Sequence, residues 1–421
     1  MRHELPSLQR PITDDRDAWH TYWKAQGQSW RTEPEIAEER QAELVEYRAV
    51  VPDIQKGNYP FRDIKLSRAD IEWLLATHEG GHGPIEWNYE HQRRGEGLDL
   101  RGADLRSVDL HSLPLTCLRS GLNRNEAIEA TLEQRNMAAV HLEGANLSLA
   151  HLEGAYFCSA HLEGVNLYRT RLEGADIYGA RLEGAYLKEA RLGGASLRTS
   201  FFDDASNFND VELVNEKLGC ALLSGVHWND MSLLRTDWTQ IKILGDENEA
   251  RQTKRWDGEI KNKEEWLYSY QIAVQAYRQL AIVLQAQGLN EESAKFAYRA
   301  QVLQRKVSCH QRRLGQYFFS LFLSLLAGYG YKLWRSFAAY VLVIAIFAAT
   351  YYHFGSIMRI SLSPIEAIVF SMTSFHGRGF TPGENIGLSN PLTILAAIEA
   401  LVGLIIEVTL IATLTQRFFK R

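Results

Sequence analysis

Cysteine is scarce in this chain, and no two cysteines stand at a spacing typical of a metal or redox pair. The 421 residues contain only Cys117, Cys158, Cys220 and Cys309. Widely spaced thiols without a CxxC pair predict reduced cysteines in a cytosolic compartment. The composition therefore excludes a small disulfide scaffold, and its 46% of hydrophobic residues exclude a disordered protein.

An apolar leader and catalytic motifs are missing as well. Residues 1–40 are dense in charge and contain no apolar run of the kind a signal peptide needs. The chain has no P-loop, nucleophile elbow or HExxH arrangement. We therefore expect the large N-terminal part to stay on the cytoplasmic side, and a protein that is not an enzyme and uses no cofactor.

Charge is scarce in the last quarter of the chain. Residues 317–421 carry 11 charged residues in 105, seven basic and four acidic, and residues 1–316 carry the other 86. Because the whole chain has a net charge of −5, the C-terminal part has +3 and the rest has −8. This division predicts a soluble, mildly acidic part joined to a lipid-compatible one.

Apolar residues recur with a period of five from Leu98 onward. The first are Leu100, Leu105 and Leu110, and after a stretch without the pattern at residues 114–137 they continue as Leu142, Leu147, Leu152, Phe157, Leu162, Leu167, Leu172, Ile177, Leu182, Leu187, Leu192, Leu197 and Phe202. A period of five fits neither an α-helix nor a β-strand. It fits a square coil in which each side is one pentapeptide with its central apolar residue inside. The pattern shifts by one residue near Ala205, and we expect it to continue through Phe208, Leu213, Leu218, Leu223, Trp228, Leu233 and Trp238.

This pattern resembles the pentapeptide-repeat family, which implies a right-handed quadrilateral β-helix over residues 96–240, with the insert at 114–137. Four sides per coil would stack His141, His161 and Arg181 in one column, with Glu143 and its equivalents beside them. Such a column is either a metal or pH site or a solvated ladder of paired charges, which we favour. Gyrase-protecting members of the family mimic DNA, but residues 140–210 carry ten acids against six bases. So weak a bias predicts no nucleic-acid partner.

Helical segments flank the repeats. Residues 1–95 are predicted to form a mainly helical cytoplasmic region. Residues 241–310 indicate a charged connector and two amphipathic helices around Gly288, a hairpin that either connects or couples the domains. Residues 311–335 include an apolar run too short to span a membrane, so we expect an interfacial helix there.

Residues 336–421 contain two apolar stretches near spanning length, at residues 337–352 and 392–415. Basic residues lie before the first stretch and after the second: Lys332, Arg335, Arg417, Lys420 and Arg421. The excess of positive charge predicts that both flanks lie in the cytoplasm. We expect a multi-pass protein of the cell membrane with both termini inside.

Between these stretches, Ser363 and Pro364 open a short apolar helix that is followed by a Gly-x-Gly turn. This layout is typical of a pore loop and resembles the two-transmembrane tetrameric cation-channel superfamily. The resemblance implies a selectivity filter made of Ser374, Phe375, His376, Gly377, Arg378, Gly379 and Phe380. Arg378 replaces the tyrosine of that superfamily. Its guanidinium either turns back toward Glu366 or Glu384, which we favour, or makes the pore prefer anions.

The second stretch supplies candidates for the inner pore and gate, namely Gly403, Glu407, Thr409 and Thr413. An ionisable residue inside a span faces a cavity or a partner. Glu407 lies four residues after Gly403, where inner helices of the superfamily often bend, and a ring of its carboxylates would attract cations. A carboxylate paired within the helix bundle is an equally good interpretation.

The chain also looks like a bacterial group of pentapeptide-repeat proteins that end in FHGRGF and IATxTQRFF, here residues 375–380 and 411–419. The expected fold is mixed: a quadrilateral β-helix, a helical hairpin, and an α-helical two-span membrane domain with a re-entrant pore helix. The expected function is a homotetrameric, cation-conducting channel that the repeat domain assembles or gates. Its partners are the lipid bilayer, its own copies and permeant ions. A membrane-anchored scaffold, an anion pore set by Arg378 and an unknown cytoplasmic ligand stay open.

Overall fold

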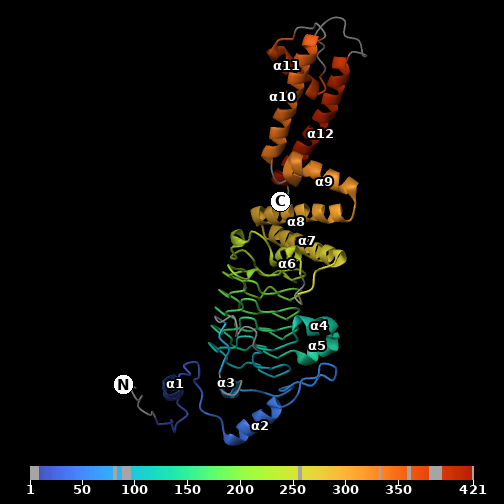
Figure 1. Ribbon diagram of the computed structural model, residues 1–421. Helices are drawn as coiled ribbons and strands as arrows, with labels where there is room; N and C mark the ends of the chain where they lie inside the picture. The colour runs from blue at the N-terminus through green and yellow to red at the C-terminus, as the bar shows by residue number, and fades with distance from the viewer. Residues whose placement is uncertain are drawn as a thin grey trace, which may run out of the picture. The chain divides into compact units, whose positions relative to one another are not determined.

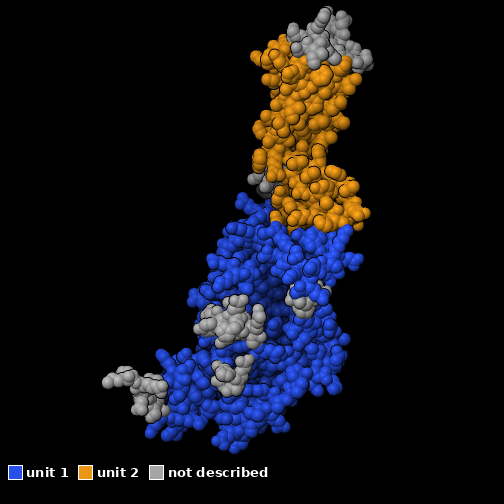
Figure 2. Space-filling model, in the orientation of Figure 1, with its two compact units in different colours: residues 1–296 blue, residues 297–421 orange. Residues whose placement is uncertain are grey.

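The computed structural model describes residues 9–78, 83–87, 96–254, 258–330, 333–357, 362–378 and 391–419. The chain divides into two compact units, Met1–Phe296 and Ala297–Arg421 (Figure 2). The first unit is built around a four-sided coil, and the second unit consists of helices (Figure 1). Each unit is described by itself below.

Parallel backbone bridges join each turn of the coil to the next along four columns. One column contains Lys65, Asp104, His141, His161, Arg181, Phe201 and His227, and a second contains Asp99, Arg119, Tyr156, Asp176, Ser196 and Leu222. The third contains Asp109, Asn146, Asn166, Tyr186 and Asn207, and the fourth Pro114, His151, Arg171, Arg191 and Glu212. The apolar residues of the period-five pattern point inward, and those from Leu142 to Phe202 are all buried. The square coil expected from the repeats is therefore present.

The corner after each inward residue uses a left-handed backbone conformation. Gly144 has φ +67° and Gly164 has φ +65°, in the fourth position of the H/R-L-E-G-A unit. On the alternate sides a residue with a side chain takes the same conformation, such as Arg169 with φ +54°. Glycine adopts this region without a steric cost, so it favours the turn wherever it stands.

The insert in the coil is shorter than the sequence suggested. Pro114 pairs with His151 and Arg119 pairs with Tyr156, so this stretch forms sides of the first coil. Leu115 continues the period of five and is buried. Among the described residues Pro114 has no bridge partner in an earlier coil, so its lack of an N–H breaks no described bridge. The insert is limited to the segment that carries α4 (Arg124–Glu129) and α5 (Leu132–Ala138).

The pattern shift near Ala205 is present, but the expectation for Leu218 is wrong. Tyr186 pairs with Asn207, one residue more than the regular twenty. The next segment then leaves the coil as a hairpin of β1 (Val214–Asn215) and β2 (Gly219–Cys220). Leu218 lies in the loop between these strands and is 38% exposed. The hairpin absorbs the surplus residues, so that Leu223 returns to the interior.

Residues before the repeats close one end of the coil, so the coil begins earlier than residue 96. Lys65 pairs with Asp104 as part of the first turn. Three helices accompany this segment, α1 (Arg16–Ala25), α2 (Glu38–Arg48) and α3 (Arg68–Ala76), with non-helical connections at residues 26–37 and 49–67. Figure 1 shows them at the end opposite to α6 and α7.

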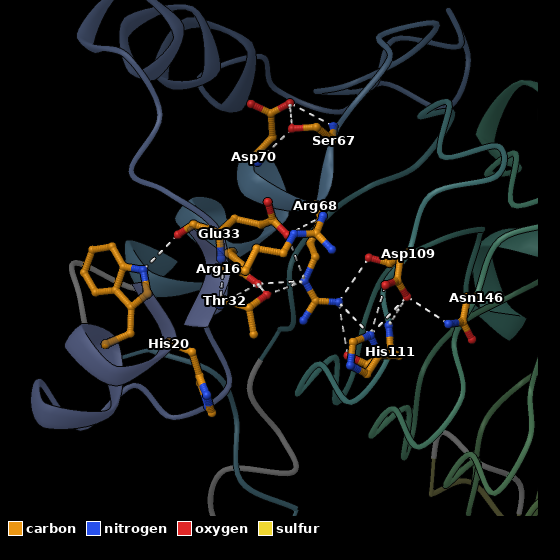
Figure 3. A network of polar contacts seen from close by, with 12 residues as sticks. Arg16, His20, Thr32, Glu33, Ser67, Arg68, Asp70, Asp109, His111 and Asn146 are labelled. Carbon is orange, nitrogen blue, oxygen red and sulfur yellow. Dashed lines mark hydrogen bonds and ion pairs between the residues drawn. The ribbon is translucent and has the colours of Figure 1, made fainter. Parts of the chain in front are cut away.

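A buried polar network attaches these helices to the first turn of the coil (Figure 3). The Arg68 guanidinium donates to the carbonyl oxygens of Asp109 (3.1 Å) and His111 (3.2 Å). Its Nε donates to Glu72 at 2.8 Å, and Glu72 in turn accepts from the backbone N–H groups of Thr32 and Glu33. These donors satisfy carbonyl groups that no preceding coil reaches, which is what a terminal cap of a repeat array requires.

The other end of the coil is covered by η3 (Trp238–Gln240), α6 (Gly245–Arg251) and α7 (Lys263–Ala286). Side-chain oxygens of α7 and its C-cap accept from coil backbone N–H groups. Gln279 accepts from Gly225 at 3.0 Å, and the C-cap Gln287 accepts from Leu233 at 2.7 Å. Helix α8 (Asn290–His310) follows after Gly288, which has φ +81°. The two predicted amphipathic helices around Gly288 are therefore present, and the first of them caps the coil.

Helix α8 crosses the boundary between the units, and the second unit continues with α9 (Leu314–Ala327), η4 (Gly328–Gly330), α10 (Leu333–Ile357), α11 (Pro364–Phe375) and α12 (Pro391–Phe419). Gly328 ends α9 in a left-handed conformation. The Arg335 guanidinium of α10 then donates to the carbonyl oxygen of Ser324 at 3.0 Å. An apolar cluster of Tyr351, Ala367, Phe370 and Leu392 joins α10, α11 and α12.

Candidate functional site

Two helices of the second unit are long and apolar enough to cross a membrane. They are Trp334–Phe354 of α10 (21 residues) and Pro391–Ala412 of α12 (22 residues). At 1.5 Å per residue, each covers the roughly 30 Å of a bilayer hydrocarbon core. The two apolar stretches expected from the sequence coincide with these helices, which qualify as spans by length and composition.

Helix α11 begins where the sequence predicts. Ser363 is its N-cap and Pro364 its first residue, and the Glu366 carboxylate completes a capping box by accepting from the N–H of Ser363 at 2.7 Å. The Glu366 carboxylate therefore caps the N-terminus of α11. It does not hold Arg378, whose side chain is exposed and has no ion-pair partner among the described residues. Glu384, the other carboxylate considered for Arg378, lies outside the described residues.

The described members of the predicted filter lie at the end of α11. Ser374 and Phe375 lie in its last turn, and His376 is the C-cap. Gly377 has φ +67°, its N–H donates to the Ser374 carbonyl (2.9 Å), and the Arg378 N–H donates to the Thr373 carbonyl (3.0 Å). This pair of bonds is a Schellman motif, which satisfies carbonyls at a helix end. Gly379 and Phe380 lie outside the described residues.

Glu399 is fully buried between the three helices and is held by two hydroxyl groups. The Tyr351 hydroxyl of α10 donates to one carboxylate oxygen at 2.6 Å, and the Ser371 hydroxyl of α11 donates to the other. A buried carboxylate inside an apolar bundle needs such partners. An ionisable residue in an apolar helix faces either a cavity or a partner, and Glu399 faces partners. Its hydrogen bonds connect α10, α11 and α12.

A second polar chain joins the end of α11 to α12. The His376 Nδ1 contacts the Glu407 carboxylate, and the Tyr340 hydroxyl lies 3.1 Å from His376 Nε2. The imidazole of His376 thus links a hydroxyl of α10 to a carboxylate of α12. His376 and Glu407 remain 38% and 36% exposed. The structure thus brings together one predicted filter residue and one predicted inner-pore residue.

Gly403 permits the close approach of α12 to the end of α11. A Cβ atom at this position would lie 2.1 Å from the carbonyl oxygen of Phe375. That distance is far inside van der Waals contact, so only glycine fits here. Of the other inner-pore candidates, Thr409 donates its hydroxyl to the Ile405 carbonyl at 2.7 Å, and the side chain of Thr413 lies outside the described residues.

Sequence reasoning missed Tyr340 and Tyr351. Both lie in α10, where Tyr340 contacts His376 at the end of α11 and Tyr351 donates to Glu399 of α12. The available signal was a tyrosine hydroxyl in an otherwise apolar segment, which needs a partner when buried. That signal does not say which acid or imidazole the hydroxyl meets.

Comparison with known proteins identifies the coil. Residues 136–174 and 166–204 match the family model described as "Pentapeptide repeats (8 copies)". The match and the bridged columns together show that the chain contains a pentapeptide-repeat domain and, beside it, two helices that qualify as membrane spans. No curated protein matches the chain.

Several solved structures are similar to this chain. A pentapeptide repeat protein from the cyanobacterium Cyanothece 51142 is 24% identical over 32% of this chain and 84% of its own, with a TM-score of 0.15. A pentapeptide repeat protein of the Arabidopsis thaliana thylakoid lumen is 16% identical over 40% and 90%, with a TM-score of 0.18. HetL from a Nostoc cyanobacterium, involved in heterocyst differentiation regulation, is 20% identical over 39% and 86%, with a TM-score of 0.12.

Proposed function

We propose that this chain forms a homotetrameric ion channel in the cell membrane, with two spans and one re-entrant helix per subunit and both termini in the cytoplasm. One observation carries the proposal. Helix α11, 12 residues long, packs between two helices of spanning length and ends in a tight turn that contacts α12. At 1.5 Å per residue it reaches only about 18 Å, so it enters the bilayer without crossing it.

A single copy does not provide the surroundings that this arrangement needs. Only 11% of the α10 span and 17% of the α12 span are buried within the chain. Backbone that turns at membrane depth must be covered by protein or line a water-filled path. Four copies around an axis supply that path between the ends of α11, and lipid covers the outer faces.

We propose that the pore conducts cations. The Glu407 carboxylate is partly exposed and lies against His376, close to the end of α11. Four such carboxylates would concentrate cations below the α11 turns. The pentapeptide-repeat domain assembles or gates this pore.

The exposed Arg378 favours a second candidate, an anion-selective pore. Its guanidinium follows the Gly377 turn and pairs with no described carboxylate. Four guanidinium groups at the axis would repel cations and attract anions. The two candidates predict reversal potentials of opposite sign in a salt gradient.

Planar-bilayer recordings on the purified protein in an asymmetric KCl gradient test both candidates. For a cation pore we expect a discrete conductance with a cation-sided reversal potential that changes little in Arg378→Ala. An anion-sided potential that collapses in Arg378→Ala would make Arg378 the selectivity ring. A verified tetramer that conducts under no condition would contradict the channel and favour the membrane-anchored scaffold.

A further inference from the structure

The ladder of charges on the coil has one exception. In the H/R-L-E-G units, Glu153, Glu163, Glu173 and Glu183 each have an arginine within 4.0 Å. The shortest pairs join Glu153 to Arg171 (2.9 Å) and Glu163 to Arg181 (3.0 Å), and in both the arginine comes 18 residues later. The residue 18 after Glu143 is His161, and the only ion-pair partner of Glu143 among the described residues is His141.

Two imidazoles and a carboxylate therefore meet where the rest of the ladder has a guanidinium. The His141 and His161 rings stack with centroids 4.6 Å apart and an angle of 10° between their planes. The His141 Nδ1 lies 2.9 Å from Glu143 Oε1. One ligand atom from each of His141, Glu143 and His161 lies within 4.8 Å of the other two.

The nearby guanidinium groups form their ion pairs with other carboxylates, although the charge of Arg106 also acts on Glu143. Asp104, the coil neighbour of His141, is held by Arg106 at 2.6 Å, and Glu163 is held by Arg181 at 3.0 Å. The cluster offers two imidazole nitrogens and one carboxylate, a donor set suited to divalent first-row transition metals rather than to Mg²⁺ or Ca²⁺.

We propose that His141, Glu143 and His161 form a binding site for one divalent transition-metal ion, of which Zn²⁺ is the natural probe. Two Zn–N bonds of about 2.1 Å at a tetrahedral angle place their nitrogen atoms about 3.4 Å apart. The three side chains are partly exposed, so small rotations of the rings bring the ligands to this separation. Water completes the coordination. The ion joins two successive coils and stabilises them by binding the folded state.

The chain contains its own control. His151 belongs to an identical HLEG unit, but the next residue in its column is Arg171, so it has no second imidazole above it. His161→Arg is the matching test variant. This variant places an arginine 18 residues after Glu143, as in the Glu153–Arg171 and Glu163–Arg181 pairs. It is expected to preserve the coil while removing a metal ligand.

The experiment uses the full chain in detergent, with no histidine tag and with Cys309→Ser to remove the exposed thiol. Equilibrium dialysis measures Zn²⁺ binding, and visible absorption of the Co²⁺ form reports its coordination. We expect one Zn²⁺ per chain and at least tenfold weaker binding in His161→Arg and Glu143→Gln, with unchanged binding in His151→Ala. Zn²⁺ should also raise the melting temperature of the parent but not of His161→Arg.

Three results would overturn the proposal. The first is no stoichiometric Zn²⁺ in the parent protein. The second is binding by His161→Arg as tight as in the parent, and the third is an equal loss in His151→Ala. A melting curve of metal-free His161→Arg establishes that the variant is folded, so that loss of Zn²⁺ binding is assigned to the missing ligand.

Discussion

Buried carboxylates on the coil depend on single arginines. The Glu153 side chain is fully buried, and burial raises its pKa while the neighbouring Arg171 lowers it. Glu163 has the same relation to Arg181, but its side chain is 24% exposed. Loss of the ion-pair partner destabilises the folded state more when the remaining charge is buried than when water can reach it. The two pairs therefore offer a matched comparison within one repeat.

We expect Arg171→Ala to destabilise the protein by about 2 kcal/mol, and Arg181→Ala by less than about 1 kcal/mol, because water replaces the partner of Glu163. Thermal unfolding in detergent at pH 8 measures both. Burial raises the folded-state pKa of Glu153 above its unfolded value, so protonation stabilises the folded state as pH falls toward that pKa. The destabilisation caused by Arg171→Ala should therefore shrink as pH falls. Equal defects in the two variants would show that burial of the acid does not decide the effect.

The four cysteines should differ sharply in reactivity. Burial raises the pKa of the Cys117 and Cys158 thiols to about 11 and that of Cys220 to about 12. The thiolate is the reactive form, so these three groups are both inaccessible and protonated at neutral pH. Cys309 is exposed in α8.

A maleimide at pH 7 should label one thiol per native chain and four per denatured chain. Peptide mass mapping should place the native label on Cys309, and the Cys309→Ser variant should take up almost none. Rapid labelling of Cys220 in the native protein would mean that the end of the coil opens readily.

At the scale of the helices, glycine at position 403 decides how close α12 comes to α11. A Cβ there would meet the Phe375 carbonyl at 2.1 Å, whereas nothing lies within 4 Å of a Cβ at Gly315 in α9. Both residues are helical, so alanine is intrinsically favoured over glycine at both by about 1 kcal/mol.

We expect Gly403→Ala to lower the melting temperature and to change the open probability of the proposed channel, because α12 has to move away from the end of α11. Gly315→Ala should leave both unchanged or raise stability slightly. Thermal unfolding and bilayer recordings of the two variants provide the comparison. A Gly403→Ala protein indistinguishable from Gly315→Ala would contradict the close packing of these helices.

At the scale of the whole molecule, the proposed channel requires a closed ring of chains. We expect native mass spectrometry in detergent to find four copies of the 47.9-kDa chain. A stable monomer in mild detergents would contradict the channel and favour a membrane-anchored scaffold. This measurement does not depend on knowing the conducted ion or the gating stimulus.

Deletion of residues 1–310 tests whether the repeat domain acts on the pore. We expect single-channel recordings to show an altered open probability or a loss of tetramers, because the deletion removes the coil, its caps and the whole helical hairpin. Normal conductance with a normal open probability would exclude a gating or assembly role for this part. Helix α8 ends at His310, so a cut there removes this helix whole and leaves α9 intact.

Features that depend on short stretches of chain were predictable from the sequence. The period of five places Leu142 to Phe202 inside because each side of the coil repeats the same local geometry. Ser363 and Pro364 mark the start of α11 because a cap bonds groups within one turn. The two apolar stretches coincide with α10 and α12 for the same kind of reason, since composition over about 20 residues decides them.

Features that depend on residues distant in the sequence were decided only by the tertiary structure. Lys65 joins the first coil through Asp104, the surplus residues around Leu218 leave as a hairpin, and Glu399 meets hydroxyls from two other helices. His376 contacts Glu407 although 31 residues separate them. A periodic pattern states which residues turn inward. It does not state which distant group lies opposite each of them, because that choice follows from how whole elements pack.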